Sequence, residues 1–463
     1  MSQHHILYAL EDKPGFMVSL TAAVQHVLAS FIGVVTPTLI IASALGLQAE
    51  VPYLISMALL VTGIGTFIQT RGFGPVGSGL VAIQGTSFAF ISALLMVGTT
   101  IKARGGTNDD ILAMMFGVCF WGAFVEIILS QFITQLKRVI TPITTGVVII
   151  AIGISLIKVG MTDLAGGFNS DDFGSVENLN LGLTVLLVII FFNAHRNRWL
   201  RLSAIFIGMS LGTLIAFFAG MTDFTALTSL PVFSFPQPFK YGFNFDWALF
   251  LPIALIYFFT AIETAGDLTA NSLFCQLPIR GDKYLKRIRA GILGDGFNSL
   301  MAAIFCTFPN TTFGQNNGVI QMTGIASRKV GYFVAAVFVV LGVFPFIGAV
   351  LQAIPKPVLG GATLVMFAMV AVGGVKILTS EPLTQRNSLI TACSLGMGLG
   401  VMMVGDVLAQ LPPWLANIFV SPVTTAGLTA IVLTVVLPGS KVADTSTDSL
   451  QSDVTKQQPC TEK

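Results

Sequence analysis

Two acidic side chains interrupt an apolar stretch in the middle of the chain. Glu263 and Asp267 lie four residues apart in "FDWALFLPIALIYFFTAIETAGDLTANSLF", so a helix places both carboxyl groups on one face. An ionisable group inside a hydrophobic span is costly unless it faces water or a partner. No Lys or Arg lies at matching depth, which disfavours a structural ion pair, and two neighbouring carboxylates favour protonation of one of them. The pair is predicted to serve a proton-coupled carrier.

A dense polar cluster occupies "FPNTTFGQNNGVIQMTG" (308–324), where a bilayer-spanning segment would be apolar. Its amide and hydroxyl residues are Asn310, Thr311, Thr312, Gln315, Asn316, Asn317 and Gln321. Irregular backbone at membrane depth survives only where it lines a protein cavity. We expect a short extended segment followed by a half-helix that begins near Gln315 and offers free backbone N–H groups to a bound acceptor atom.

The stretch "GPVGSGLVAIQGTSFAFISALL" (74–95) is a weaker counterpart of that cluster. It combines several glycines with Gln84, Thr86 and Ser87, and it predicts a second extended segment and half-helix. Paired broken segments in two halves of a chain are a sequence sign of a transporter's binding site. For Gln84 and Thr86, simple hydrogen bonding between helices explains the pattern equally well.

Two more polar residues lie in apolar runs. Asp295, in "GILGDGFNSL", is either part of a polar network or a helix-end residue near the basic loop that precedes it. His26, in "TAAVQHVLASF", is either a satisfied buried histidine or a ligand contact. The five cysteines show no metal-ligand spacing, and no catalytic triad or phosphate-binding loop is present, so we expect neither a metal, a cofactor nor an enzyme.

The composition identifies the elements that must position these residues. The 463-residue chain is 54% hydrophobic and 10% charged, with a mean hydropathy of +0.83, against about 25% charged residues in soluble domains. Apolar runs near the length of a membrane span, about 20 residues, recur roughly fourteen times. They begin near residues 16, 52, 78, 110, 140, 180, 202, 247, 291, 314, 331, 358, 388 and 418. The chain is predicted to be an integral membrane protein, and its net charge of +2 gives no indication of nucleic-acid binding.

The distribution of basic residues predicts the orientation. If residues 1–15 are a retained cytoplasmic segment, fifteen Lys and Arg residues fall in the cytoplasmic loops and five in the outer loops. This asymmetry predicts an even number of spans with both ends in the cytoplasm. Residues 439–463, rich in Ser, Thr, Asp and Gln, are predicted to be a disordered cytoplasmic tail.

The chain also contains a weak internal repeat. Residues 138–160 align with residues 353–377, which places Pro142 on Pro357 and Gly146 on Gly361. Seven spans in each half would turn the second copy upside down in the membrane, as in many secondary transporters. The alternative is a chance similarity between two helices that both begin at a proline.

The stretch "GQNNGVIQMTGIASRKVG" (314–331) resembles the signature of the nucleobase/ascorbate transporter family (nucleobase:cation symporter-2). The positions that fit the signature are Gln315, Asn316, Gly318, Thr323 and Gly324. The stretches "ETAGDLTA", "QGTSF" and "VLGGATLVMF" fit as well, and the similarity extends over residues 8–438. The stretch "QNNGVIQ" looks closest to the corresponding stretch of the bacterial xanthine permeases.

This resemblance implies an all-α fold of fourteen spans in two inverted repeats, within residues 16–438. Spans 1–4 and 8–11 would form a mobile core domain and spans 5–7 and 12–14 a gate domain. The resemblance further implies a homodimer in the lipid bilayer of the bacterial inner membrane, with elevator-like movement of the core against the gate.

The resemblance also implies a site. Glu263 and Gln315 would bind the purine edge, and the backbone N–H groups of Phe88 and Gly314 would meet its carbonyls, with Asp267 in proton coupling. Asp295 and His26 would support this network, His26 as a possible substrate contact, and Asn316 and Ser87 would set selectivity. A Gln amide offers a donor and an acceptor side by side, which matches a lactam edge. The Phe88 ring would either stack on the purine or pack in the protein.

The expected function is proton symport of xanthine, with urate as a second substrate because Ser87 is small and Gln315 replaces the Glu of uracil carriers. The alternatives of coupling to sodium and of transporting guanine or hypoxanthine stay open. The competing hypothesis is an anion exchanger or channel of the same fold, which the two carboxylates Glu263 and Asp267 disfavour.

Overall fold

The computed structural model describes residues 6–132, 135, 141–167, 170–222, 233, 235–279 and 281–438, with residues 198, 315, 322, 413 and 414 described by their backbone alone. The predicted tail, 439–463, lies outside the described residues. The first half contains α1 (Phe16–Leu45), η1 (Gln48–Glu50), α2 (Val51–Arg71), β1 (Gln84–Thr86), η2 (Phe88–Phe90), α3 (Ile91–Ala103), α4 (Asn108–Gln131), α6 (Pro142–Leu164), α7 (Val176–Asn193), α8 (Arg198–Leu202) and α9 (Ala204–Phe218). The second half contains α10 (Trp247–Phe274), α11 (Asp282–Ile304), β2 (Asn310–Thr312), α12 (Gln315–Thr323), α13 (Arg328–Val343), α14 (Pro345–Gln352), α15 (Lys356–Leu378), α16 (Gln385–Met403), η4 (Gly405–Leu408), α17 (Pro413–Phe419) and α18 (Pro422–Val436).

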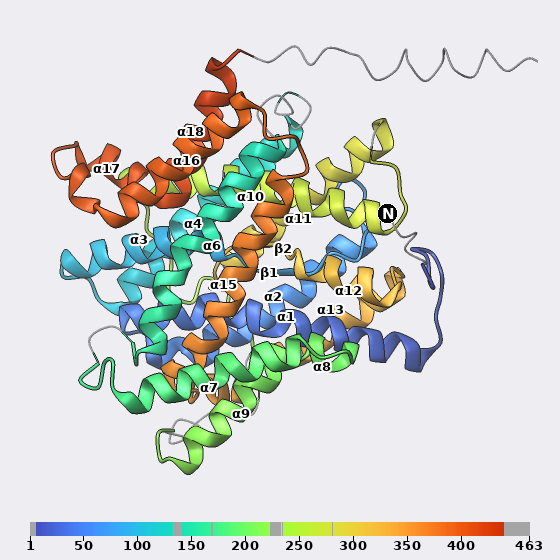
Figure 1. Ribbon diagram of the computed structural model, residues 1–463, viewed down its shortest axis with the longest axis horizontal. Helices are drawn as coiled ribbons and strands as arrows, with labels where there is room; N and C mark the ends of the chain where they lie inside the picture. Colours follow the sequence, from blue (N-terminus) through green and yellow to red (C-terminus); the bar gives the residue numbers. More distant parts are fainter. Residues whose placement is uncertain are drawn as a thin grey trace, which may run out of the picture.

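Most described elements are helices (Figure 1). Seven of the described helices are long and apolar enough to cross a bilayer, and the pair α13 and α14, bent by 76°, makes an eighth if it counts as one span. Shorter apolar helices cover Phe88–Ala103, Ala204–Phe218 and Pro422–Val436. The chain is therefore a mostly helical, multi-pass membrane protein.

Local sequence signals fix where the helices begin. Thr107 caps α4 through a reciprocal pair of hydrogen bonds with Asp110, and Thr141 caps α6 ahead of Pro142. One predicted boundary was wrong: the helix expected near residue 291 begins at Asp282. The basic stretch "DKYLKRIRA" continues the helix beyond its apolar part, because a helix can extend out of the hydrophobic layer with polar residues.

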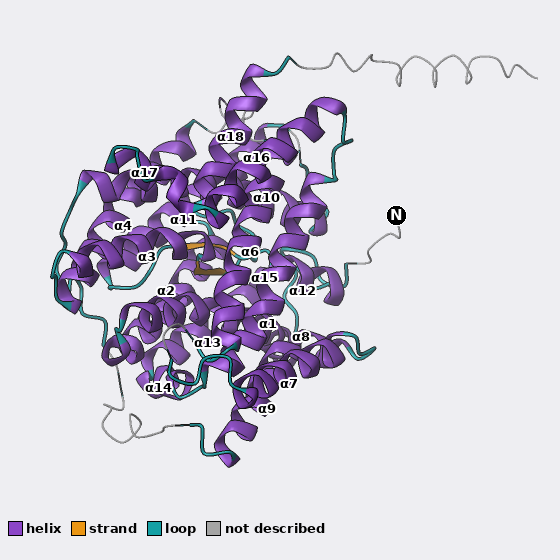
Figure 2. Cartoon of the chain, turned by 60° about the vertical axis from the view of Figure 1, so that its left-hand side comes forward, coloured by secondary structure: helices purple, strands orange, loops and turns teal. Residues whose placement is uncertain are grey.

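Two short strands lie at the centre of the helical assembly (Figure 2). β1 pairs antiparallel with β2 so that Gln84 lies opposite Thr312, Gly85 opposite Thr311 and Thr86 opposite Asn310. The extended segments predicted in the two polar stretches are thereby confirmed, and each is followed by a helix. The Phe313 ring packs directly against Gly85 of β1 and fills the space that a side chain there would need. An ideal Cβ atom on Gly85 would lie only 2.5 Å from the Cζ atom of Phe313.

The helices of the two halves pack in matching pairs. α2 packs against α13 while α4 packs against α11, and α6 packs along α15 (Figure 1). Gly146 of α6 faces Leu378 of α15, whereas Gly153 faces Ala371, so the two helices run antiparallel. These are the two helices that carry the sequence repeat.

Candidate functional site

One of the two acids of α10 lies against the start of α12. Glu263 and Asp267 are partly accessible, and an ideal Cβ on Gly314 would lie 2.9 Å from the Asp267 Oδ1 atom. Asn317 of α12 donates from Nδ2 to the Asp267 carbonyl over 3.0 Å. The Glu263 Oε2 atom has no hydrogen-bond partner among the described residues. The structure thus brings together the acidic pair and the polar half-helix, the two features that the sequence singled out.

Two helix N-termini meet at the same place. Gly314 is the N-cap of α12, and Phe88 opens η2, which continues into α3. The first N–H groups of a helix have no partner within that helix, and they carry partial positive charge. Both backbones are therefore suited to binding a carbonyl or another acceptor, although their predicted contact with a purine stays a prediction.

The Phe88 ring is held by aromatic neighbours. It stacks on Phe313 with ring centroids 6.4 Å apart and meets Phe367 edge-on at 5.5 Å. Only 8% of Phe88 is exposed. The packing explanation therefore fits its side chain.

Asp295 is the most highly bonded acid of the site. It is fully buried and accepts from Gln69 Nε2 at 2.6 Å, from the Thr312 N–H and hydroxyl at 3.2 and 3.1 Å, and from the Thr264 hydroxyl. These donors come from α2, β2 and α10. The position in the middle of α11 contradicts the alternative of a helix-end residue, and Asp295 instead joins a polar network that holds β2 in place.

Three other predicted residues keep unused polar atoms. The ring of His26 lies beside Asn316, and neither ring nitrogen has a hydrogen-bond partner of ordinary geometry among the described residues. Asn316 donates to the Val81 carbonyl but leaves Oδ1 unpaired, and the Ser87 hydroxyl is buried with no described partner. Unpaired buried polar atoms are uncommon, and these are available to hydrogen-bond a ligand. The Gln315 side chain lies outside the described part of the structure, so its predicted role stays a prediction.

Comparison with known proteins identifies the family. A family model described as a permease family matches residues 17–407. The chain belongs to that family, the xanthine and uracil permeases. Its relatives include the xanthine permeases XanP and XanQ of Escherichia coli strain K12. XanP is 44% identical over 441 residues, covering 94% of this chain and 95% of XanP. XanQ is 43% identical over 438 residues, covering 94% of each chain. The permease is thus a membrane transporter and not an enzyme.

The fold of the permease has a solved counterpart. The transmembrane domain of the cyanobacterial bicarbonate transporter BicA aligns with a TM-score of 0.56 at 17% identity, covering 88% of this chain and 99% of that one. At this identity the likeness concerns the fold alone.

Several residues of the permease network were missed from the sequence. Gln69, Thr264 and Asn298 hold the centre together, yet each is an uncharged residue beside other polar residues, so its sequence context did not set it apart. Glu126, a fully buried acid in "WGAFVEIILSQ", was also missed, although an acid within an apolar span indicates a functional residue. Its surroundings are described below.

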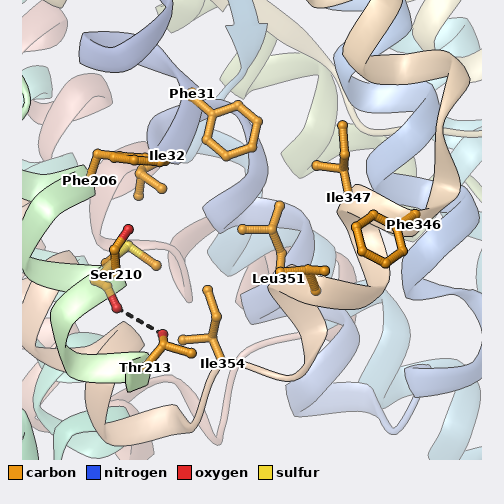
Figure 3. A pocket seen from close by; sticks show the side chains of 11 residues that line it. Phe31, Ile32, Phe206, Ser210, Thr213, Phe346, Ile347, Leu351 and Ile354 are labelled. Carbon is orange, nitrogen blue, oxygen red and sulfur yellow. Dashed lines mark hydrogen bonds between the residues drawn. The ribbon is translucent and has the colours of Figure 1, made fainter. Parts of the chain in front are cut away.

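A separate cavity of about 330 Å³ lies between α1, α9 and α14 (Figure 3). Its walls are apolar apart from Ser210 and Thr213, and Thr213 donates its hydroxyl to the Met209 carbonyl over 2.8 Å. A purine needs several donors and acceptors. The cavity therefore does not meet the needs of a purine, and the candidate site of the permease stays at α10 and α12.

Proposed function

We propose that this permease imports xanthine, with urate as a second substrate, by proton symport across the bacterial inner membrane. The observation that carries the proposal is the partly accessible acidic pair of α10, whose Asp267 lies against the N-terminus of α12. The xanthine permeases at 43–44% identity support the substrate class. No cofactor is needed beyond the coupling proton.

The recognition chemistry follows from the donors and acceptors of the site. The Glu263 carboxylate accepts from ring N–H groups, and the Gln315 amide pairs with a lactam edge. The N–H groups of Phe88 and Gly314 donate to carbonyl oxygens at the helix N-termini. A ligand that lacks one of these groups leaves a buried atom unpaired, at a cost of about 1–3 kcal/mol.

The remaining polar residues adjust this arrangement. Asn316 and Ser87 set selectivity through their unpaired atoms, and His26 contacts the substrate or Asn316. Asp267 takes part in proton coupling, because protonation of one acid of the pair relieves the repulsion between the two. Asp295 supports both through β2 and α10.

The fold that we propose has fourteen spans in two inverted repeats, with both termini in the cytoplasm. The antiparallel pairing of β1 with β2 and of α6 with α15 supports it, because a two-fold axis in the membrane plane produces such pairs. We further propose that spans 1–4 and 8–11 move as a core domain against a gate domain of spans 5–7 and 12–14, in a homodimer.

Uptake of labelled xanthine into cells tests the proposal. We expect competition by urate and xanthine, loss of accumulation with a protonophore, and little dependence on sodium. Glu263→Gln should abolish uptake while the protein stays in the membrane, whereas Glu177→Gln, at an exposed position of α7, should leave uptake unchanged. Normal uptake by Glu263→Gln would overturn the site assignment. Chloride-driven exchange without purine uptake would favour an anion exchanger instead.

A further inference from the structure

A third buried acid lies on α4, outside the candidate site. Glu126 is fully buried, and neither carboxyl oxygen has a hydrogen-bond partner among the described residues. It shares a helix face with Cys119 and Gly122, which lie seven and four residues earlier. Tyr257 of α10 donates its hydroxyl to the Cys119 carbonyl over 3.0 Å and packs on Gly122. This face of α4 therefore looks toward α10.

The next residue of α4 contacts α11. An ideal Cβ on Gly296 would lie 2.7 Å from Ile127 Cγ1, so α4 and α11 approach closely beside Asp295. Glu126 is near enough to Asp295 and Glu263 for their charges to interact. It thus lies near both the acid of the polar network and the acid predicted to bind substrate.

The groups that face Glu126 include no cation among the described residues. α10 contributes Glu263 and Tyr257, and α11 contributes Asp295, while Arg289 of α11 donates instead to Gln131 at the end of α4. The basic residues at the end of α3 are engaged elsewhere: Lys102 donates to the Leu45 carbonyl, and Arg104 pairs with Asp246. An ionised carboxylate without donors or a counter-ion is far more costly to bury than a carboxylic acid. In this state Glu126 therefore holds its proton.

We propose that Glu126 is a further proton-carrying residue of the transport cycle, and this inference rests on the proposed proton symport. In another state of the cycle, where Glu126 reaches water or a donor while Glu263 is charged, the Glu126 carboxyl gives up its proton and a carboxylate oxygen of Glu263 gains it, so the total charge of the group is unchanged. The reverse transfer restores Glu126. An acid buried among other acids is expensive for a membrane protein, and such residues in spans commonly belong to proton relays.

The test uses the full-length permease in proteoliposomes with Glu126→Gln, which keeps the shape of a neutral acid but cannot release a proton. We expect exchange of labelled for unlabelled xanthine without a gradient to stay near the wild-type rate. Accumulation driven by an inward proton gradient should fall about tenfold or more, because Gln removes a charge-carrying group from the relay. Glu177→Gln, on the exposed face of α7, is the matched control and should change neither activity.

The two hypotheses fail differently in this assay. Wild-type accumulation that ignores the proton gradient would overturn the proposed symport. Gradient-driven accumulation by Glu126→Gln at the wild-type level would overturn only the role of Glu126.

A second measurement needs no variant. A hydrophobic carbodiimide reacts with protonated carboxyl groups in apolar surroundings, and peptide mass spectrometry locates the adduct. In the wild-type protein we expect an adduct on Glu126 that decreases as the pH rises. Protein labelled at Glu263 but not at Glu126 at any pH would contradict the proposal.

Discussion

The two broken spans that meet at the centre of the molecule differ in how their amide side chains are bonded. In the first, Gln84 of β1 donates to the Thr312 hydroxyl over 3.0 Å and accepts from Asn298 at 3.3 Å. In the second, α12 has nine residues, and both Asn316 and Asn317 leave the Oδ1 atom without a described partner. The amide of the first span is used within the protein, whereas those of the second keep acceptors free.

This difference separates support from recognition. A buried amide that is fully bonded fixes the geometry of its neighbours, and it has nothing left to offer a ligand. A buried amide with a free oxygen can bind a ligand donor, and it costs free energy until it does so. We therefore expect substitution of Gln84 in β1 to change stability first and substitutions of the α12 amides to change substrate binding first.

Asp295 joins the two regions, so its replacement should have the largest effect. Asp295→Asn keeps the size of the side chain but replaces one carboxylate oxygen with an NH2 group. Both oxygens of Asp295 accept hydrogen bonds, so the new NH2 group would face a donor instead of accepting from it. Since hydrogen bonds to a charged group contribute about 1.5–3 kcal/mol each, we expect a clear loss of thermal stability and no detectable xanthine uptake. Size-exclusion chromatography after heating measures the first and labelled uptake the second.

Asp109→Asn is the control for that substitution, because Asp109 is exposed in the first turn of α4. It should leave both properties near wild type. A stable and active Asp295→Asn protein would show that the network does not hold β2 in place.

The contrast itself is tested by a pair of amide truncations. Gln84→Ala should lower the thermal stability, because Thr312 and Asn298 lose their partner. Asn316→Ala should change stability less and raise the KM for xanthine about 5- to 150-fold, the effect of losing about 1–3 kcal/mol of binding free energy. Thermal unfolding and xanthine uptake at a series of xanthine concentrations, measured on both variants, test this contrast.

The opposite outcome would reverse the assignment. If Gln84→Ala raises the KM at unchanged stability while Asn316→Ala only destabilises, the β1 side recognises the substrate and α12 supports it.

The sequence carried enough information to predict both broken spans, because glycines and amides in an apolar run disfavour a continuous helix. It also singled out Glu263, Asp267 and Asp295 through their charge. It could not predict that Gln84 meets Thr312, 228 positions later, since such pairing is decided by how the two halves fold together. Gln69 was missed for the same reason: a glutamine near the polar end of a helix shows its role only through its hydrogen bond to Asp295, which lies far away in the sequence.

The smallest effect is expected for the hydroxyl of Ser87. Ser87 and Ser56 are both buried, and neither hydroxyl has a described partner, so Ser→Ala at either position removes a polar group that makes no bond. Stability should stay equal or rise by up to about 1 kcal/mol in both variants, because the cost of burying an unpaired hydroxyl disappears. The two positions differ in place: Ser56 lies where α2 meets Gly342 of α13, while Ser87 precedes η2 at the candidate site. Only Ser87→Ala should therefore change how strongly urate competes with labelled xanthine. Equal competition curves for both variants would mean that Ser87 is a packing residue like Ser56, and that selectivity depends on α12 alone.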